Sequence, residues 1–312
     1  MGDIVRVAGL TKRYGDLTAV DGVSFEVREG EIFGLLGPNG AGKTTTISMV
    51  SCLLEPSGGD VEVDGHSVRT DPGGVKRVLG VVPQEIALYP TLTAIENLRF
   101  WGRMYGLSGA LLKERVAEAL ELAGLADRAK DRIEKYSGGM KRRINIAAGV
   151  LHHPKLLLMD EPTVGIDPQS RNHIPETVAR LNAEGMTVVY TSHYMEEVEH
   201  LCDRVAIVDH GKVVACGTKE ELRGLVGDMD VVTIAVDEST EAALESVRAV
   251  AGVERVERAD GSLQVLSRDG GRVLASVLGA LADAGARVHS VDVQAPDLES
   301  VFLHLTGTSL RD

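Results

Sequence analysis

Cysteine, aromatic residues and long apolar runs are all scarce in this sequence of 312 residues. No stretch approaches the roughly 18 consecutive apolar residues that a membrane-spanning helix needs, and the N-terminus lacks the apolar core of a secretion signal. The three cysteines, Cys52, Cys202 and Cys216, show neither disulfide pairing nor metal-ligand spacing. We therefore expect a soluble, unexported protein whose reduced cysteines pack in its core.

Positive charge is also in deficit. Lysine and arginine number 33 against 46 aspartate and glutamate residues, which gives a formal net charge of −13. A molecule with this charge repels a polyanion such as DNA, so we expect no nucleic acid partner. Apolar residues, in contrast, make up 44% of the chain. They suffice for two packed cores, and the length favours one large and one small domain.

The residue pattern changes several times along the first two thirds of the chain. Residues 1–36 alternate short strand-like runs with turns, and residues 92–135 have the apolar spacing of helices. After this helical insert, the sequence predicts strands at 155–160 and 186–192 and helices at 168–184 and near 194–201. Such alternation is typical of a parallel α/β sheet. Pro175 falls inside one of these helices and is predicted to kink or split it.

The remaining third of the chain has the pattern of a separate domain. A capping-box pattern from Thr218 to Glu221 opens a short helix, and the segment GLVGDMD marks a boundary at 226–229. Beyond it, we expect strands at 231–236, 253–258, 262–267 and 287–293, and helices at 240–250 and 272–284. A closing helix with an apolar stripe follows Pro296 and Asp297. This order predicts a small α+β domain of the ferredoxin-like kind over residues 229–312.

A glycine-rich segment gives the first chemical signal. It has the pattern G-x-x-x-x-G-K-[ST], follows an apolar strand and precedes a helix, as a phosphate-binding loop does. Its residues are Gly37, Pro38, Asn39, Gly40, Ala41, Gly42, Lys43, Thr44 and Thr45. Backbone N–H groups of such a loop wrap the phosphates of ATP, Lys43 contacts the β and γ groups, and Thr44 is a ligand for Mg²⁺. Thr45 adds a further phosphate contact. A glycine-rich turn with a surface lysine is the alternative, and the flanking strand and helix disfavour it.

Two carboxylates end the apolar strand LLLMDE at 156–161. Burying them is costly unless a metal ion or another cation neutralises their charge. Asp160 is the expected magnesium ligand, and Glu161 is expected to act as a general base or to orient the attacking water. The alternative for Glu161 is an N-terminal cap of the next helix.

The segment YSGGM at 136–140 precedes that strand, and with these three motifs the sequence resembles the ABC ATPase family. The resemblance implies that Ser137, Gly138 and Gly139 face the γ-phosphate of the ATP held by the other subunit. The start of a helix suits that role because its free N–H groups and partial positive charge attract anions. Catalysis would then need a dimer, formed with a second copy or with a paralogous ATPase subunit.

The same resemblance implies roles for four single residues. Tyr14 would stack on the adenine, Gln84 would sense magnesium and water, and His193 would contact the γ-phosphate. Asp167, in the segment VGID at 164–167, would lie in the loop through which the two subunits touch, and would also cap a helix opened by Pro168. Taken alone, each of these residues has an ordinary structural or solvated alternative. The sequence departs from the family pattern at Tyr136, Met140 and Val164, but every residue expected to carry hydrolysis is present.

The resemblance covers residues 3–225 and implies a P-loop NTPase cassette over 1–226, with a β subdomain, a RecA-like core and an α-helical subdomain at about 90–137. The tail is similar to that of drug-resistance-type exporter ATPases, whose transmembrane permease subunits are separate chains. A place at the cytoplasmic face of the membrane, held there by the permease, follows from that resemblance. The candidates for contact with a permease helix are Leu88, Tyr89, Phe100 and Trp101, with packing inside the insert as an equal alternative.

Two other functions stay open at this point. A non-transport ABC ATPase of translation or DNA repair would carry two cassettes or long coiled-coil insertions, and the sequence has neither. A regulator that senses ATP without hydrolysing it would leave Glu161 without a role. The permease determines which compound is transported, so this sequence does not indicate the substrate.

Overall fold

The computed structural model describes residues 2–167, 171, 173–226, 230–236, 241–259, 262–267, 270–294 and 297–307. It divides into two compact units, residues 1–216 and 217–312. The division falls earlier in the chain than the boundary expected at 226–229. The reason is that helix α9 (Lys219–Val226) packs against α12 (Leu298–Thr306), so it belongs to the second unit.

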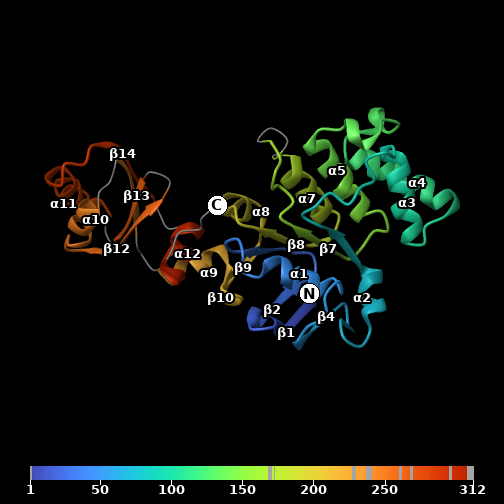
Figure 1. The fold of residues 1–312 in the computed structure, drawn as a ribbon, viewed down its shortest axis with the longest axis horizontal. Coiled ribbons are helices and arrows are strands. Elements are labelled where there is room, and N and C mark those ends of the chain that lie inside the picture. The colour runs from blue at the N-terminus through green and yellow to red at the C-terminus, as the bar shows by residue number, and fades with distance from the viewer. Residues whose placement is uncertain are drawn as a thin grey trace. The chain divides into compact units, whose positions relative to one another are not determined.

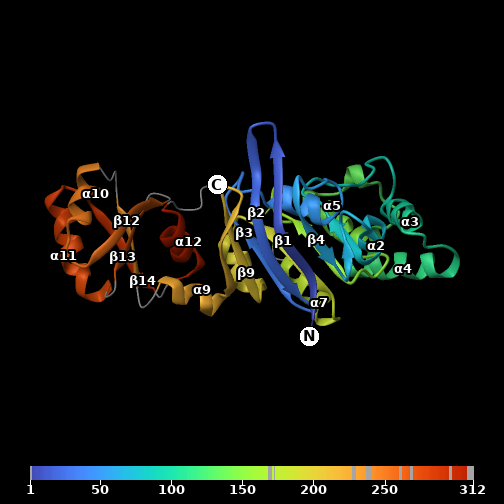
Figure 2. The ribbon, with the colours of Figure 1, turned by 90° about the horizontal axis from the view of Figure 1, so that it is seen from below.

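The first unit begins with an antiparallel sheet in the order β2-β1-β4-β5. Its strands are β1 (Asp3–Tyr14), β2 (Leu17–Arg28), β4 (Gly58–Val63) and β5 (His66–Ser67). Buried and exposed residues alternate along the second half of β2, so that Val23, Phe25 and Val27 point into the core. Figure 2 shows β1 and β2 as a long hairpin. The β-rich start expected from the sequence is thus present.

A second sheet of six strands has the order β10-β9-β3-β8-β7-β6. The strands are β3 (Ile32–Leu36), β6 (Leu79–Val82), β7 (Leu156–Asp160), β8 (Thr187–Ser192), β9 (Arg204–Asp209) and β10 (Lys212–Thr218). Strands β6, β7, β8, β3 and β9 pair in parallel, and every residue of β3, β7 and β8 is buried. Such strands are covered on both faces. Because parallel strands end at one edge, the segments after β3, β7, β8 and β6 emerge together there.

The helices of this unit lie on and beside the six-stranded sheet (Figure 1). They are α1 (Lys43–Val50), α2 (Pro72–Val78), α3 (Ala94–Met104), α4 (Gly109–Leu122), α5 (Gly138–Gly149), α7 (His173–Ala183) and α8 (Met195–Leu201), with short 3₁₀ turns at Ala126–Arg128 and Ile133–Lys135. The helices α3, α4 and α5 share a core of their own that includes Leu98, Leu112 and Ile144, which we call the helical insert. Pro175 lies in α7, and Arg171, just before the bounds of that helix, is helical as well. The kink expected at Pro175 stays a prediction.

The second unit contains strands and helices in the expected order. After α9 come β11 (Asp230–Val236), α10 (Glu241–Arg248), β12 (Val253–Ala259), β13 (Ser262–Ser267), α11 (Gly270–Asp283), β14 (Val288–Gln294) and α12. The sheet order is β12-β13-β11-β14, and all neighbouring strands are antiparallel. The capping box from Thr218 to Glu221 is formed, with hydrogen bonds of 2.8 and 3.1 Å. Relationship to the ferredoxin-like folds stays an interpretation of this order.

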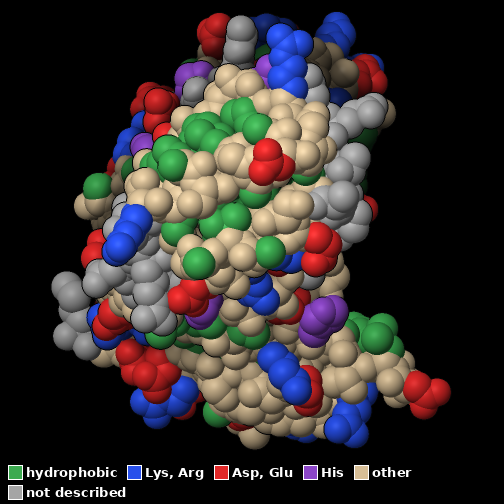
Figure 3. All heavy atoms as spheres, turned by 90° about the vertical axis from the view of Figure 1, so that its left-hand side faces the viewer, with side chains coloured by type: hydrophobic (Ala, Val, Ile, Leu, Met, Phe, Trp, Pro, Cys, Tyr) green, Lys and Arg blue, Asp and Glu red, His purple; other side chains and the backbone are tan. Residues whose placement is uncertain are grey.

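Apolar residues of α10, α11 and the sheet form the core of the second unit, with partly buried residues such as Val250 and Leu274 at its edge. Figure 3 looks onto this unit and shows apolar side chains gathered on that face, with few charged ones among them. In the part of the chain that is described, no helix has both the length and the apolar character needed to cross a bilayer.

Candidate functional site

The glycine-rich loop joins β3 to α1 and requires glycine at two points for steric reasons. A Cβ atom on Gly37 would lie 2.2 Å from the carbonyl oxygen of Val208, and one on Gly42 would lie 2.6 Å from that of Ala19. Gly42 also has a φ of 102° and is the N-cap of α1. The loop therefore lies close to the backbones of β9 and β2 and brings the first N–H groups of α1 to one place, which suits an anion.

Lys43, the first residue of α1, is 3% exposed. Its Nζ donates hydrogen bonds to the carbonyl oxygens of Gly37 at 2.7 Å and Pro38 at 3.0 Å, and it pairs with Oε1 of Glu161 at 3.0 Å. These three partners use all three donors of the ammonium group. A buried ammonium is stable only when it is satisfied in this way. In this structure, the lysine of the loop is therefore held by the protein itself.

Asp160 is the last residue of β7 and is 5% exposed. Its Oδ1 accepts a hydrogen bond of 2.7 Å from the hydroxyl of Thr191, and Thr44 also donates to the carboxylate. Burial raises the pKa of Asp160, although the hydrogen bonds from Thr191 and Thr44 lower it. A desolvated carboxylate beside a threonine hydroxyl is an oxygen donor set that suits Mg²⁺. The residues present thus fit the expected magnesium site.

Glu161 follows Asp160 with a φ of 43°, a left-handed conformation that is strained for a residue with a side chain. Its N–H donates to the Thr191 hydroxyl at 2.9 Å, so one threonine holds the backbone of Glu161 and the carboxylate of Asp160. The Glu161 carboxylate is 7% exposed and lies between Lys43 and His193. Nδ1 of His193 is 3.3 Å from Oε2, but the two atoms do not have hydrogen-bond geometry. The contact is attractive when the imidazole is protonated.

Glu197 of α8 organises the backbone around these residues, and sequence reasoning missed it. Its Oε2 accepts hydrogen bonds from the hydroxyls of Thr163 at 2.9 Å, Tyr190 at 2.9 Å and Ser192 at 3.2 Å. Burial, together with the nearby Glu197, raises the pKa of Tyr190 well above its usual value. One carboxylate therefore ties the segment after Glu161 to the strand that leads into His193. No local pattern in the sequence marks it.

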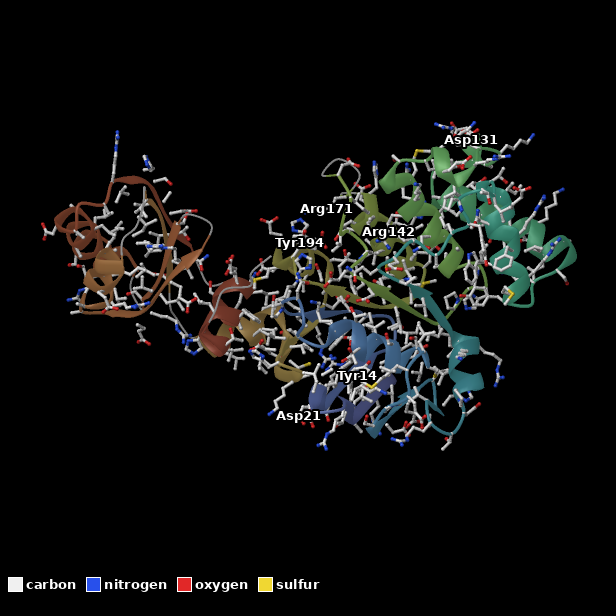
Figure 4. The ribbon with its side chains drawn as sticks, in the orientation of Figure 1. Tyr14, Asp21, Asp131, Arg142, Arg171 and Tyr194 are labelled. Carbon is white, nitrogen blue, oxygen red and sulfur yellow. The ribbon has the colours of Figure 1, made fainter. Side chains whose placement is uncertain are left out.

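The ring of His193 lies against the ring of Tyr194, with 4.1 Å between their centroids. The guanidinium of Arg171 lies over the Tyr194 ring, 4.6 Å from its centroid. Figure 4 shows Arg171 and Tyr194 side by side above the end of the sheet. The backbone N–H of Arg171 in turn donates to the carbonyl of Asp167 at 3.0 Å. Packing thus links the predicted subunit-contact loop to His193.

Tyr14 and Gln84 are both exposed. Tyr14 ends β1 and is 49% exposed, which leaves its ring open to stacking, with Nζ of Lys12 at 5.4 Å from the ring centroid. Gln84 follows β6, the strand beside β7, so its segment emerges at the same sheet edge as Asp160. Their expected ligands, adenine for Tyr14 and magnesium for Gln84, stay predictions.

Ser137, Gly138 and Gly139 lie at the start of α5, on the helical insert. Ser137 is the N-cap, and its hydroxyl accepts a hydrogen bond from the N–H of Met140 at 3.3 Å. A Cβ on Gly138 would meet only the carbonyl oxygen of Gly165, at 3.9 Å, so this helix end is open. No described hydrogen bond joins these residues to Lys43. Asp167 is exposed, and residues 168–170, where the helix that it was expected to cap would begin, lie outside the described residues.

Comparison with known proteins places this geometry in a family. Residues 20–164 match the family described as ABC transporter. The linearmycin resistance ATP-binding protein LnrL of Bacillus subtilis is 51% identical over 311 residues, which cover 99% of this chain and 100% of that protein. The chain belongs to the ATP-binding proteins of the ABC transporter family. The daunorubicin/doxorubicin resistance ATP-binding protein DrrA of Streptomyces peucetius is 40% identical, and the match covers 99% of this chain and 94% of that protein.

Solved structures agree with the fold of an ABC ATPase cassette. An ATP-binding subunit of an ABC transporter has a TM-score of 0.66 at 32% identity and covers 72% of this chain and 93% of its own. A dimeric ATP-binding cassette in a post-hydrolysis state, bound to ADP and Pi, has a TM-score of 0.63 at 28% identity and covers 69% and 98%. The expected family, the P-loop fold and ATP binding are therefore confirmed. The roles of single residues stay predictions.

Proposed function

We propose that this chain is the ATP-hydrolysing subunit of an ABC exporter, and that two cassettes enclose two ATP molecules and drive a separate permease. The observation that carries the proposal is the buried cluster at the end of the sheet. There the Glu161 carboxylate lies 3.0 Å from Lys43 and 3.3 Å from His193, beside the desolvated Asp160. Glu161 has a strained backbone, and its buried carboxylate is held between Lys43 and His193, as expected of a group that orients water.

Lys43 and Glu161 restrain each other before ATP binds. The phosphates of ATP offer Lys43 stronger partners than the carbonyls of Gly37 and Pro38, so the ammonium would move to the β and γ groups. Glu161 would then be free to accept a proton from the attacking water, and His193 would contact the γ-phosphate. A magnesium ion held by Asp160, Thr44 and Gln84 would neutralise charge on the phosphates. The ion pair between Lys43 and Glu161 would thus keep the Glu161 carboxylate occupied until ATP binds.

The open start of α5 supports a shared site. Ser137 and Gly138 are exposed, so the N–H groups at the start of α5 can receive the phosphates of a second cassette. A dimeric cassette is found among the solved structures similar to this chain. The partner would be a second copy or a paralogous subunit, and the exposed Asp167 would lie at the contact.

Transport is supported by the relatives. Their names describe resistance to linearmycin and to daunorubicin and doxorubicin, and a 40% identical relative from Ralstonia nicotianae is a Nod factor export ATP-binding protein. We propose export of a drug, a lipid or a similar compound through a permease in the cell membrane, with this chain at its cytoplasmic face.

Of the four candidates for contact with a permease helix, Leu88 and Trp101 are held inside the helical insert. Trp101 donates to the Ala87 carbonyl at 3.0 Å and Leu88 is 8% exposed, whereas Tyr89 is 45% exposed. Phe100 lies edge-on to both Tyr89 and Trp101. Of the four, Tyr89 is therefore the side chain most open to a partner.

Phosphate release by the purified chain tests the proposal. We expect wild-type protein to release phosphate from Mg-ATP, and Glu161→Gln to bind ATP but lose nearly all turnover, because the phosphate loop is kept while the base is removed. Glu196→Gln is the matched control, since Glu196 is an exposed acid in the first turn of α8. Wild-type protein that binds ATP without releasing phosphate would instead support the regulator that senses ATP. Normal turnover in Glu161→Gln would contradict the assigned role.

A further inference from the structure

Arg142 is a buried cation in the helical insert that the reaction described above does not use. It lies in α5, one turn after the Ser137–Gly139 start of that helix, and is 3% exposed. Burial lowers the pKa of Arg142, while the nearby Tyr190 and Asp160 raise it. The guanidinium forms no ion pair with a carboxylate of the described residues. A buried charge without such a partner is costly, so its contacts call for an explanation.

Those contacts are with the backbone that carries Gln84. Nη1 of Arg142 donates to the carbonyl oxygen of Pro83 at 2.7 Å, and Nη2 donates to that of Gln84. The planar fork of the guanidinium matches two successive carbonyls, which the single ammonium point of lysine cannot do. The Gln84 side chain itself is exposed and free to reach a ligand. Arg142 therefore fixes the position of the Gln84 backbone and makes no hydrogen bond to the side-chain amide of Gln84 among those described.

Further contacts attach the same segment to the insert. Asn145, on the next turn of α5, accepts a hydrogen bond of 3.1 Å from the N–H of Ala87. From α3, Asn97 bonds both the N–H and the carbonyl of Tyr89, at 2.7 and 3.1 Å. Residues 83–89 are thus held by the helical insert, although Gln84 serves the site at the end of the sheet. A displacement of α5 would carry Gln84 with it.

We infer that Arg142 is a positioning residue that couples the two nucleotide sites of the dimer, because it joins the helix start facing one ATP to the Gln84 backbone at the other. The inference rests on the proposed hydrolysis by paired cassettes. Arrival of a γ-phosphate at Ser137–Gly139 of α5 would shift that helix, and the guanidinium would transmit the shift to Gln84 of its own chain. Each site then hydrolyses ATP fastest when the other is filled.

The matched control is the next residue along the helix. Arg143 also belongs to α5 and donates to a backbone carbonyl, that of Ala123, at 2.9 Å, but this carbonyl belongs to the helical insert and not to the Gln84 segment. Arg142→Lys and Arg143→Lys each keep the charge and remove the fork. We expect Arg142→Lys to lower kcat about tenfold, to leave the KM for ATP within about twofold, and to bring the Hill coefficient for ATP close to one. Arg143→Lys should match wild type within about twofold.

A double-variant cycle separates positioning from simple support of the fold. If Arg142 acts through Gln84, then Arg142→Lys should cost less than about twofold in kcat when Gln84→Ala is already present. Additive losses, or equal effects of Arg142→Lys and Arg143→Lys, would overturn the inference. Asn145→Ala gives a second route if Arg142→Lys does not fold, since it frees the same segment at Ala87 and should lower kcat and the Hill coefficient in the same direction. Absence of turnover in wild-type protein would count against the proposed function instead.

Discussion

The ion pair between Lys43 and Glu161 allows a sharp test of the site before any nucleotide is added. We expect Lys43→Met to lower the free energy of unfolding of the first unit. Methionine keeps most of the buried length of the lysine side chain, so the loss comes from the charge and its three partners. Removing one member of a buried pair costs about 3–5 kcal/mol, because the other charge stays uncompensated. Glu161, 7% exposed, would keep only the His193 contact.

Urea unfolding followed by the fluorescence of Trp101 measures this loss, since Trp101 is the only tryptophan and lies in the first unit. Lys155→Met is the control: Lys155 pairs with Asp64 at a similar distance, 2.9 Å, but its side chain is 58% exposed. Water screens such a pair, so the control should unfold almost like wild type. Adding Glu161→Gln to Lys43→Met should recover about 2 kcal/mol, because it removes the stranded charge. Equal stability of Lys43→Met and Lys155→Met, or a double variant weaker than Lys43→Met alone, would refute the reasoning.

Two further predictions concern Asp160. Because burial raises its pKa above the ordinary 3.8, the folded protein holds a proton that the unfolded chain has released, and the free energy of unfolding should fall as pH rises from that value through the raised pKa. Asp160→Asn should show a smaller fall when urea unfolding is measured at successive pH values, and equal slopes would contradict the buried charge. Added together with ATP, Mg²⁺ should raise the melting temperature of wild-type protein beyond the effect of ATP alone, as measured by scanning fluorimetry. Asp160→Asn should lose that gain, and a full gain in the variant would place the ion elsewhere.

Local patterns were sufficient to predict much of the site. The loop ending in Lys43 and the strand ending in Asp160 and Glu161 each combine a motif with its structural context inside one short segment. The order of elements in the second unit was also readable, because short strands and amphipathic helices alternate there with clear turns. The compact units divide before α9, because the packing of α9 on α12 joins segments far apart in the chain.

Long-range polar contacts were not predictable from the sequence. Arg142 stands in the run KRR at 141–143, which has the composition of a solvated helix face, yet it is buried against Pro83 and Gln84. Glu197 likewise resembles its acidic neighbours in α8, although it accepts three hydrogen bonds. Only the folded backbone brings such partners together. The part of the site that orients and restrains the reacting groups is therefore visible in the structure and absent from the motifs.

Complementation between two inactive variants tests the central claim, hydrolysis at a site shared by two chains, most directly. Lys43→Met removes the phosphate lysine, and Ser137→Arg blocks the helix start that faces the partner's ATP, so each variant alone should release almost no phosphate. In a mixed dimer, the Ser137→Arg chain supplies an intact Lys43 and Glu161, and the Lys43→Met chain supplies an intact Ser137, which together make one complete site. We predict that an equal mixture recovers activity well above that of either variant, up to a limit of about a quarter of the wild-type rate per chain, which random pairing in twofold dimers sets. A mixture no more active than the two variants measured separately would contradict the shared site.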